Sequence, residues 1–196
     1  MFFQQFSFIA LGILVVSSAA TLLTRSWRLR VSALALQYVG VFWLVAISWS
    51  FGLASIKLVT GWMAGAILGV SRIDQLPADS RRWPTERLFQ ALVVLLVILT
   101  SVNVSPNISA WVLTIHPSQA FGGLLLIGIG LAHLGIASRG LRVIVSLLTV
   151  LSGFEILYAA IESSALVAGL LAVVDLGIAM VGAFLLSSIT EAEENE

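Results

Sequence analysis

Four ionisable side chains lie inside or at the edge of long apolar runs of this sequence. Lys57 lies in FGLASIKLVTGWMAGAILG, Glu155 in LLTVLSGFEILYAAIES and Asp175 in AGLLAVVDLGIAMVGAFLL, and Glu162 follows Glu155 by two helical turns. A charged side chain at the centre of a membrane helix costs at least about 2.5–3.5 kcal/mol on insertion, so it must face protein or water. Each of these four residues is therefore a candidate functional group.

Glu155 and Asp175 suggest the most specific chemistry. Two buried carboxylates on consecutive helices joined by a short turn are expected of a proton relay, because burial favours the protonated form and so permits proton exchange. Lys57 would tune or continue such a relay, its charge either lost on burial or kept by pairing with a carboxylate. The structural alternative for each residue is an interhelical hydrogen bond or ion pair that fixes the packing.

Three further side chains are auxiliary candidates. His133, in LLLIGIGLAHLGIA, has a side chain that can shuttle protons, although a lone histidine near a helix end is commonly a packing residue. Tyr158 follows Glu155 by one turn and could hydrogen-bond in the same cavity. We expect Glu162 at the outer boundary of its span.

Other polar and small residues are expected to serve packing. Gln37, Asn103 and the serines are interpreted as ordinary hydrogen-bonding contacts between membrane helices. The glycines at 61, 65 and 69 form a GxxxGxxxG row, which predicts close packing of that span against a neighbouring helix.

The composition indicates a membrane protein. Of the 196 residues 59% are hydrophobic and 10% are charged, with a mean hydropathy of +1.06, whereas soluble domains carry about 25% charged residues. Ten basic and ten acidic residues cancel, so no basic excess points to nucleic acid as a partner. Cysteine is absent and there are two histidines, which argues against iron–sulfur, thiolate-metal and haem ligation. We expect no cofactor, no metal and no catalytic residue in this chain.

These residues must be positioned by membrane-spanning helices. A bilayer core of roughly 30 Å needs about 20 apolar residues in a helix. Division of the chain at charges and turn clusters predicts an all-α integral membrane protein with about seven transmembrane helices, at about 5–24, 31–50, 53–71, 88–105, 118–137, 142–162 and 165–189. The first span follows no basic segment and is expected to be retained rather than cleaved as a signal peptide.

The arginines predict the orientation. With seven spans, the three arginine-containing loops fall on one side; they contain Arg25, Arg28 and Arg30, then Arg72, Arg81, Arg82 and Arg87, then Arg139 and Arg142. Since short basic loops stay in the cytoplasm, this pattern predicts an amino terminus outside and a cytoplasmic carboxy terminus, with 191–196 as an acidic cytoplasmic tail.

The carboxy-terminal spans carry a resemblance to a known family. The short basic loop Ser138–Arg142, a helix with Glu155 and a helix with Asp175 followed by LGIAMVGAFLL resemble NADH-quinone oxidoreductase subunit K. In that family two intramembrane glutamates belong to a proton-conducting hydrophilic axis. Glu155 takes the first place, and Asp175 takes the second as an aspartate.

The order SWRLR, Lys57, Glu155, Asp175 resembles, over nearly the full length, the component E subunit of hydrogenase-4. This resemblance divides the chain into an N-terminal four-helix membrane region at 1–117, a subunit K-like three-helix region at 118–190 and the tail at 191–196. It implies a non-catalytic membrane subunit of a complex I-like or membrane-hydrogenase-like oxidoreductase in the cell (inner) membrane. Its partners would be antiporter-like and other membrane-arm subunits within the lipid bilayer, and these would supply the redox centres.

Two other classes stay open. One is a free-standing small secondary transporter, which inverted repeats and broken helices would favour. The other is a purely structural membrane scaffold, in which the charges only pair.

Overall fold

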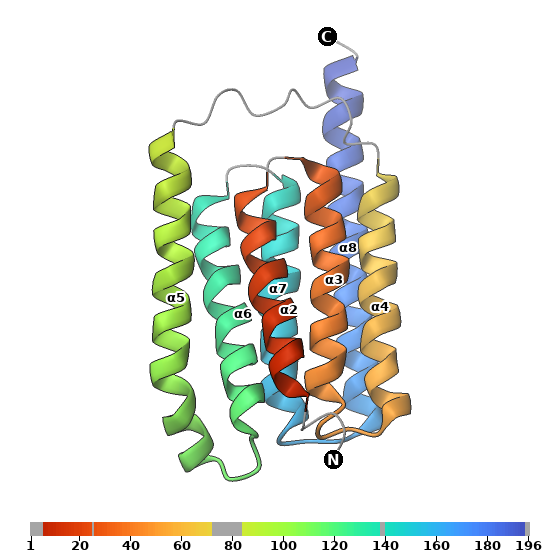
Figure 1. Ribbon diagram of the computed structural model, residues 1–196. Helices are drawn as coiled ribbons and strands as arrows, with labels where there is room; N and C mark the ends of the chain where they lie inside the picture. Colours follow the sequence, from red (N-terminus) through yellow and green to blue (C-terminus); the bar gives the residue numbers. More distant parts are fainter. Residues whose placement is uncertain (1–5, 25, 72–83, 138–139, 195–196) are drawn as a thin grey trace.

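The computed structural model describes residues 6–24, 26–71, 84–137 and 140–194. These residues form seven helices and contain no strand. The helices run side by side as an up-and-down bundle (Figure 1). In chain order they are α2 (Ser7–Leu23), α3 (Trp27–Val45), α4 (Phe51–Val70), α5 (Pro84–Trp111), α6 (Pro117–Ile136), α7 (Gly140–Ala159) and α8 (Ala165–Glu194).

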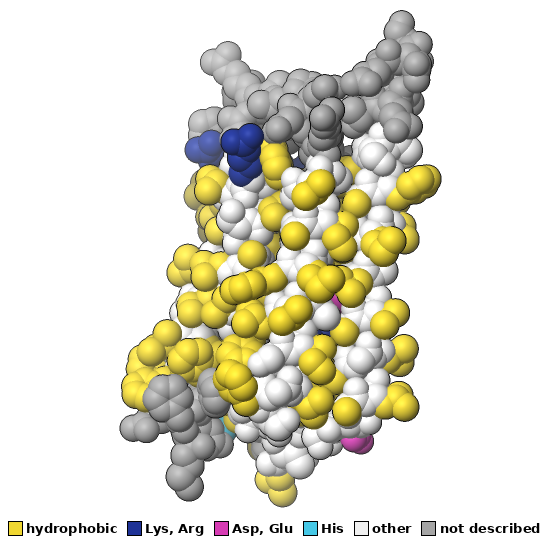
Figure 2. Space-filling model, turned by 90° about the vertical axis from the view of Figure 1, so that its right-hand side faces the viewer, with side chains coloured by type: hydrophobic (Ala, Val, Ile, Leu, Met, Phe, Trp, Pro, Cys, Tyr) yellow, Lys and Arg dark blue, Asp and Glu magenta, His cyan; other side chains and the backbone are white. Residues whose placement is uncertain are grey.

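The helices have the length and composition of membrane spans. Within the described ranges, six helices are long and apolar enough to cross a membrane, and α2 is a shorter apolar helix of 17 residues. Large hydrophobic side chains point outward from the bundle, among them Trp62 at 51% exposure and Phe184 at 71%. Figure 2 shows such side chains spread over one flank of the molecule. The chain is thus a multi-pass helical membrane protein.

The bundle has two layers. One consists of α2, α3 and α4, and the other of α5, α6, α7 and α8, with each helix packed against its neighbours in the layer (Figure 1). Between the layers, α2 packs on α6, α3 on α7 and α4 on α8. The junction of α3, α4, α7 and α8 therefore receives side chains from four helices and from both layers.

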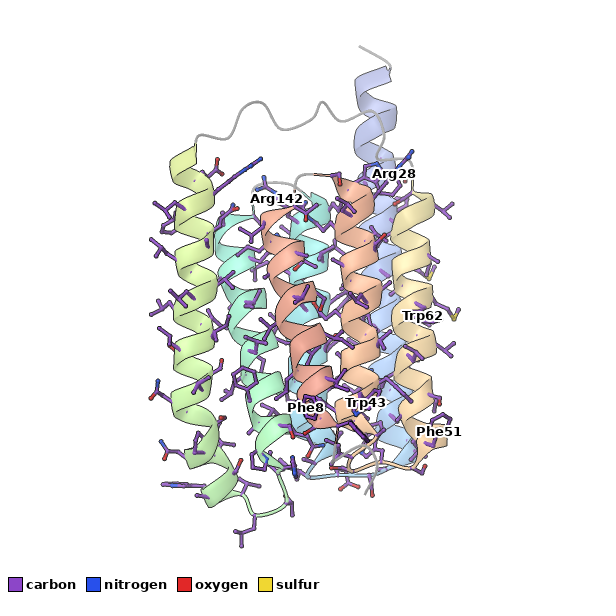
Figure 3. All side chains as sticks on the ribbon, in the orientation of Figure 1. Phe8, Arg28, Trp43, Phe51, Trp62 and Arg142 are labelled. Carbon is purple, nitrogen blue, oxygen red and sulfur yellow. The ribbon has the colours of Figure 1, made fainter. Side chains whose placement is uncertain are left out.

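The described arginines lie near one end of the bundle, which we call the basic end. Arg28 and Arg30 begin α3, Arg87 lies in the first turn of α5 and Arg142 in the first turn of α7; Figure 3 labels Arg28 and Arg142. Arg30 is buried and donates to the carbonyls of Thr21 (3.2 Å) and Thr24 (2.6 Å), which stabilises the carboxyl end of α2.

The remaining arginines of the orientation argument lie outside the described residues. They are Arg25, Arg72, Arg81, Arg82 and Arg139. Those that are described agree with the predicted clustering, because the ends of α2, α4, α6 and α8 and the starts of α3, α5 and α7 meet at the basic end (Figure 1).

The predicted helix positions are close to those observed, with differences at several boundaries. α3 runs from Trp27 to Val45 rather than from 31 to 50, and α8 continues to Glu194, into the segment 191–196 that was expected as a tail. The predicted span at 88–105 was too short, since α5 runs from Pro84 to Trp111 through Pro106. Proline at the first helical position is favourable, and inside a helix its ring removes one backbone hydrogen bond, which a membrane helix tolerates.

α6 and α7 approach each other closely because glycines face glycines and backbone. A Cβ at Gly153 would lie 2.7 Å from the carbonyl oxygen of Gly123, and one at Gly130 would lie 2.9 Å from the backbone nitrogen of Val150. Small residues at such contacts let membrane helices pack without side chains between them. This contact fixes the rotation of α7 about its own axis, and with it the direction in which Glu155 projects.

Candidate functional site

Lys57, Glu155 and Asp175 meet at the junction of α4, α7 and α8, and we call them the buried triad. The Lys57 ammonium donates hydrogen bonds to Glu155 Oε1 and to Asp175 Oδ2, the latter at 2.9 Å. The exposure of the three side chains is between 0% and 1%. The three residues singled out by the sequence as intramembrane charges thus form a single contact, with the lysine between the two carboxylates.

The triad is not electrically balanced. One positive and two negative groups leave a formal charge of −1 when all three are ionised. Within the described residues, Glu155 Oε2 and Asp175 Oδ1 have no hydrogen-bond partner although both atoms are buried. An unpaired buried charge is strongly unfavourable. One proton on either of these oxygens would remove the excess charge and convert an orphan acceptor into a donor.

Tyr38 on α3 is a fourth member of the site, which we did not predict. Its side chain is fully buried and lies within electrostatic range of both Asp175 and Glu155. Its hydroxyl has no hydrogen-bond partner within 3.5 Å in the part of the chain that is described. The phenol is therefore a polar group beside the carboxylates whose hydrogen-bonding capacity is unused.

The glycine row of α4 positions Tyr38. A Cβ at Gly61 would come within 2.1 Å of the Tyr38 ring, so the ring occupies the space that any side chain would need. For Gly65 and Gly69 the nearest such atom is Cγ1 of Val31, at 4.0 and 3.9 Å. The close packing expected of this row is thus found at Gly61, whereas Gly65 and Gly69 have only ordinary contacts. Gly61 is one turn from Lys57 on the same face.

The triad lies between two apolar cores. Toward the basic end, one core contains Leu34, Ala64, Leu148 and Ala179, contributed by α3, α4, α7 and α8. Toward the opposite end, the other core includes buried residues from the same four helices; they are Val41, Leu44, Ala54, Ile156, Ala159 and Ala168. On each helix the charged or phenolic residue thus lies where one core ends and the other begins.

The three auxiliary candidates differ in where they lie. Glu162 is exposed in the connection between α7 and α8, where its backbone carbonyl accepts from the Trp49 indole at 2.8 Å. Tyr158 is half-buried, with its ring 5.7 Å from that of Phe154. His133 is buried at 2% near the basic end of α6.

His133 and Glu155 lie at different depths in the bundle. Glu155 is 15 residues from the start of α7 and His133 is 3 residues from the end of α6. At about 1.5 Å per residue these positions are separated by about 15–20 Å along the bundle axis. Any contribution of His133 to proton movement would therefore be made near the basic end and not in the triad.

The described ranges contain no group of three or more His, Asp or Glu side chains arranged to hold a metal ion. The triad itself already contains a lysine ammonium at the position where a cation would sit between the carboxylates. Its carboxylate oxygens and its one nitrogen are groups that can bind or release a proton.

Comparison with known proteins finds no match for this chain among protein families, curated proteins or solved structures. The resemblance to subunit K and to component E of hydrogenase-4 therefore rests on the order of helices and on the charged residues quoted above.

Proposed function

We propose that this chain is a membrane subunit of a redox-driven ion pump similar to complex I or to a membrane hydrogenase, and that the buried triad takes up and releases a proton during turnover. The observation that supports this role is the meeting of Lys57, Glu155 and Asp175 in one buried contact with a formal charge of −1. A contact that served packing alone would be more stable with balanced charges.

The triad has two states that differ by one proton. In the ionised state Lys57 is shared between the two carboxylates, as observed. When a proton binds Glu155 or Asp175, that carboxyl becomes neutral and no longer forms an ion pair with the ammonium. Lys57 then pairs with the remaining carboxylate. The site of protonation thus determines which carboxylate pairs with Lys57. A neighbouring subunit that attracts or repels the ammonium would therefore drive proton uptake or release.

The chain would work within a larger assembly. It contains no cysteine, so electrons would come from redox centres in partner subunits. Antiporter-like and other membrane-arm subunits would continue the polar axis on either side. The basic end would face the cytoplasm, as the positive-inside rule requires, with the chain in the cell (inner) membrane.

The test is proton pumping by the assembly purified through a tag on this chain and reconstituted in liposomes. Glu155→Gln and Asp175→Asn should assemble normally and lose proton pumping, because neither amide can take up the proton. Glu162→Gln is the matched control, since it makes the same change at an exposed position. Unchanged pumping in the first two variants would refute the relay role and leave a structural one. Recovery of the chain alone, as a stable homo-oligomer, would favour a free-standing transporter.

A further inference from the structure

A row of hydroxyl side chains leads along α7 to the triad. Ser146, Thr149, Ser152 and Glu155 follow one another at intervals of three residues. Their exposures are 0%, 1%, 0% and 1%. Residues three apart on a helix are neighbours, with Cβ atoms about 5–6 Å apart. We call Ser146, Thr149 and Ser152 the hydroxyl row; from the sequence, its serines were expected to be ordinary interhelical contacts.

Each hydroxyl of the row can accept a further hydrogen bond. Ser146, Thr149 and Ser152 each donate to the carbonyl four residues earlier, at 2.5, 2.8 and 2.8 Å. A hydroxyl has one donor and two acceptor positions, so this bond leaves its lone pairs available. Because the hydroxyl can also rotate, it can accept a proton on one side and release one on the other.

α3 contributes two more polar groups beside the row. The Gln37 amide donates to Thr149 Oγ1 at 3.5 Å, and Gln37 Oε1 is buried without a hydrogen-bond partner in the described residues. Tyr38, the next residue, has its side chain near Ser152 and Asp175, and its hydroxyl has no hydrogen-bond partner in the described residues. The distances between successive hydroxyls are too long for direct hydrogen bonds. The Gln37 amide and the Tyr38 phenol lie beside these gaps, and each has hydrogen-bonding capacity that is not used.

The row provides a route around the apolar core that lies between the triad and the basic end. The nine steps from Ser146 to Glu155 make about two and a half turns at 3.6 residues per turn, so the two residues lie on opposite sides of the helix axis. The row therefore starts on a different side of α7 from the triad. Ser146 is one turn from Arg142, which is 7% exposed at the basic end. The row therefore extends past the apolar core that contains Leu148, from the basic end to the triad.

We infer that the hydroxyl row, with Gln37 and Tyr38, is the path by which protons pass between the basic end of the bundle and the triad. This inference rests on the proposed function. A proton leaves water near Arg142 and is passed along Ser146, Thr149 and Ser152, with Gln37, Tyr38 or an internal water bridging each gap. It ends on a carboxylate oxygen of Glu155 or Asp175, and the triad changes from −1 to neutral; release follows the same path in reverse.

The experiment uses the assembly purified through a tag on this chain and reconstituted in liposomes, and it follows carboxyl protonation by time-resolved infrared spectroscopy after a rapid drop in pH. Thr149→Val keeps the shape of the side chain and removes the hydroxyl, and it should slow protonation of the triad by about tenfold or more. Thr149→Ser restores a hydroxyl and should stay within about twofold of the unmodified chain. Thr21→Val is the matched control, because Thr21 is also fully buried and donates to a backbone carbonyl, on α2.

The outcomes separate the path from the function. Assignment of the infrared band to the triad requires that Glu155→Gln or Asp175→Asn remove it. If the band forms and Thr149→Val forms it as fast as the unmodified chain, the path is wrong while the proposed function stands. If Thr149→Val and Thr149→Ser are slowed equally, the effect is structural and the path is again wrong. If no triad carboxyl takes up a proton, both proposals are overturned.

Discussion

The ring of Tyr38 lies directly against the backbone of Gly61, at a distance that leaves no space for a side chain on α4. This contact joins α3 to α4 one turn from Lys57, and it brings the phenol to the carboxylates of α7 and α8. The position of the lysine and that of the tyrosine are therefore set by the same glycine.

Gly61→Ala should destabilise the bundle by about 1–3 kcal/mol, because its Cβ would lie 2.1 Å from the Tyr38 ring and the ring would have to move. Thermal unfolding in detergent measures the effect. Gly65→Ala is the control, since its nearest neighbour would be 4.0 Å away and alanine is the better helix former. Equal unfolding temperatures for the two variants would contradict this account of the contact.

Lys57→Met should cost about 3–5 kcal/mol, because it leaves two buried carboxylates without a cation. The triple variant Lys57→Met, Glu155→Gln, Asp175→Asn carries no charge in the triad and should recover most of that loss. Comparison of the unfolding temperatures of the single and triple variants checks both statements. A single variant as stable as the unmodified chain would mean that the carboxylates do not depend on the lysine.

The sequence allowed prediction of the helices and of the three charged residues, because long apolar runs and isolated charges are local features. Pairing of Lys57 with a carboxylate was one of the open alternatives, but the sequence could not show that both Glu155 and Asp175 contact the same ammonium, because that depends on how α4, α7 and α8 pack. The end of α5 was missed because proline usually ends a helix in water, whereas at Pro106 the helix continues.

Tyr38 and the hydroxyl row were missed for a different reason. A tyrosine in an apolar run and serines in a membrane helix are common packing residues, so their types alone are uninformative. Two local signals were available: Gly61, one turn from Lys57, which leaves space for a large side chain from a neighbouring helix, and the three-residue spacing of Ser146, Thr149, Ser152 and Glu155.

The orientation of the bundle can be tested with single cysteines, because the chain contains none of its own. Ser26→Cys lies at the basic end and Ser163→Cys at the opposite end, and both serines are exposed. A membrane-impermeant thiol reagent added to intact cells should label Ser163→Cys and leave Ser26→Cys unlabelled, with the reverse pattern in inverted vesicles. The opposite labelling would place the basic end outside.

Tyr38→Phe separates the two tasks of this side chain. It keeps the ring that fills the space over Gly61, so the unfolding temperature should stay close to that of the unmodified chain. It removes the hydroxyl between Ser152 and Asp175, so protonation of the triad after a drop in pH should slow by about tenfold. Tyr38→Ala is the contrasting variant and should cost about 3–5 kcal/mol, because it leaves a cavity at the four-helix junction. If Tyr38→Phe protonates at the normal rate, the hydroxyl is not part of the path, and the tyrosine acts at this junction through its ring alone.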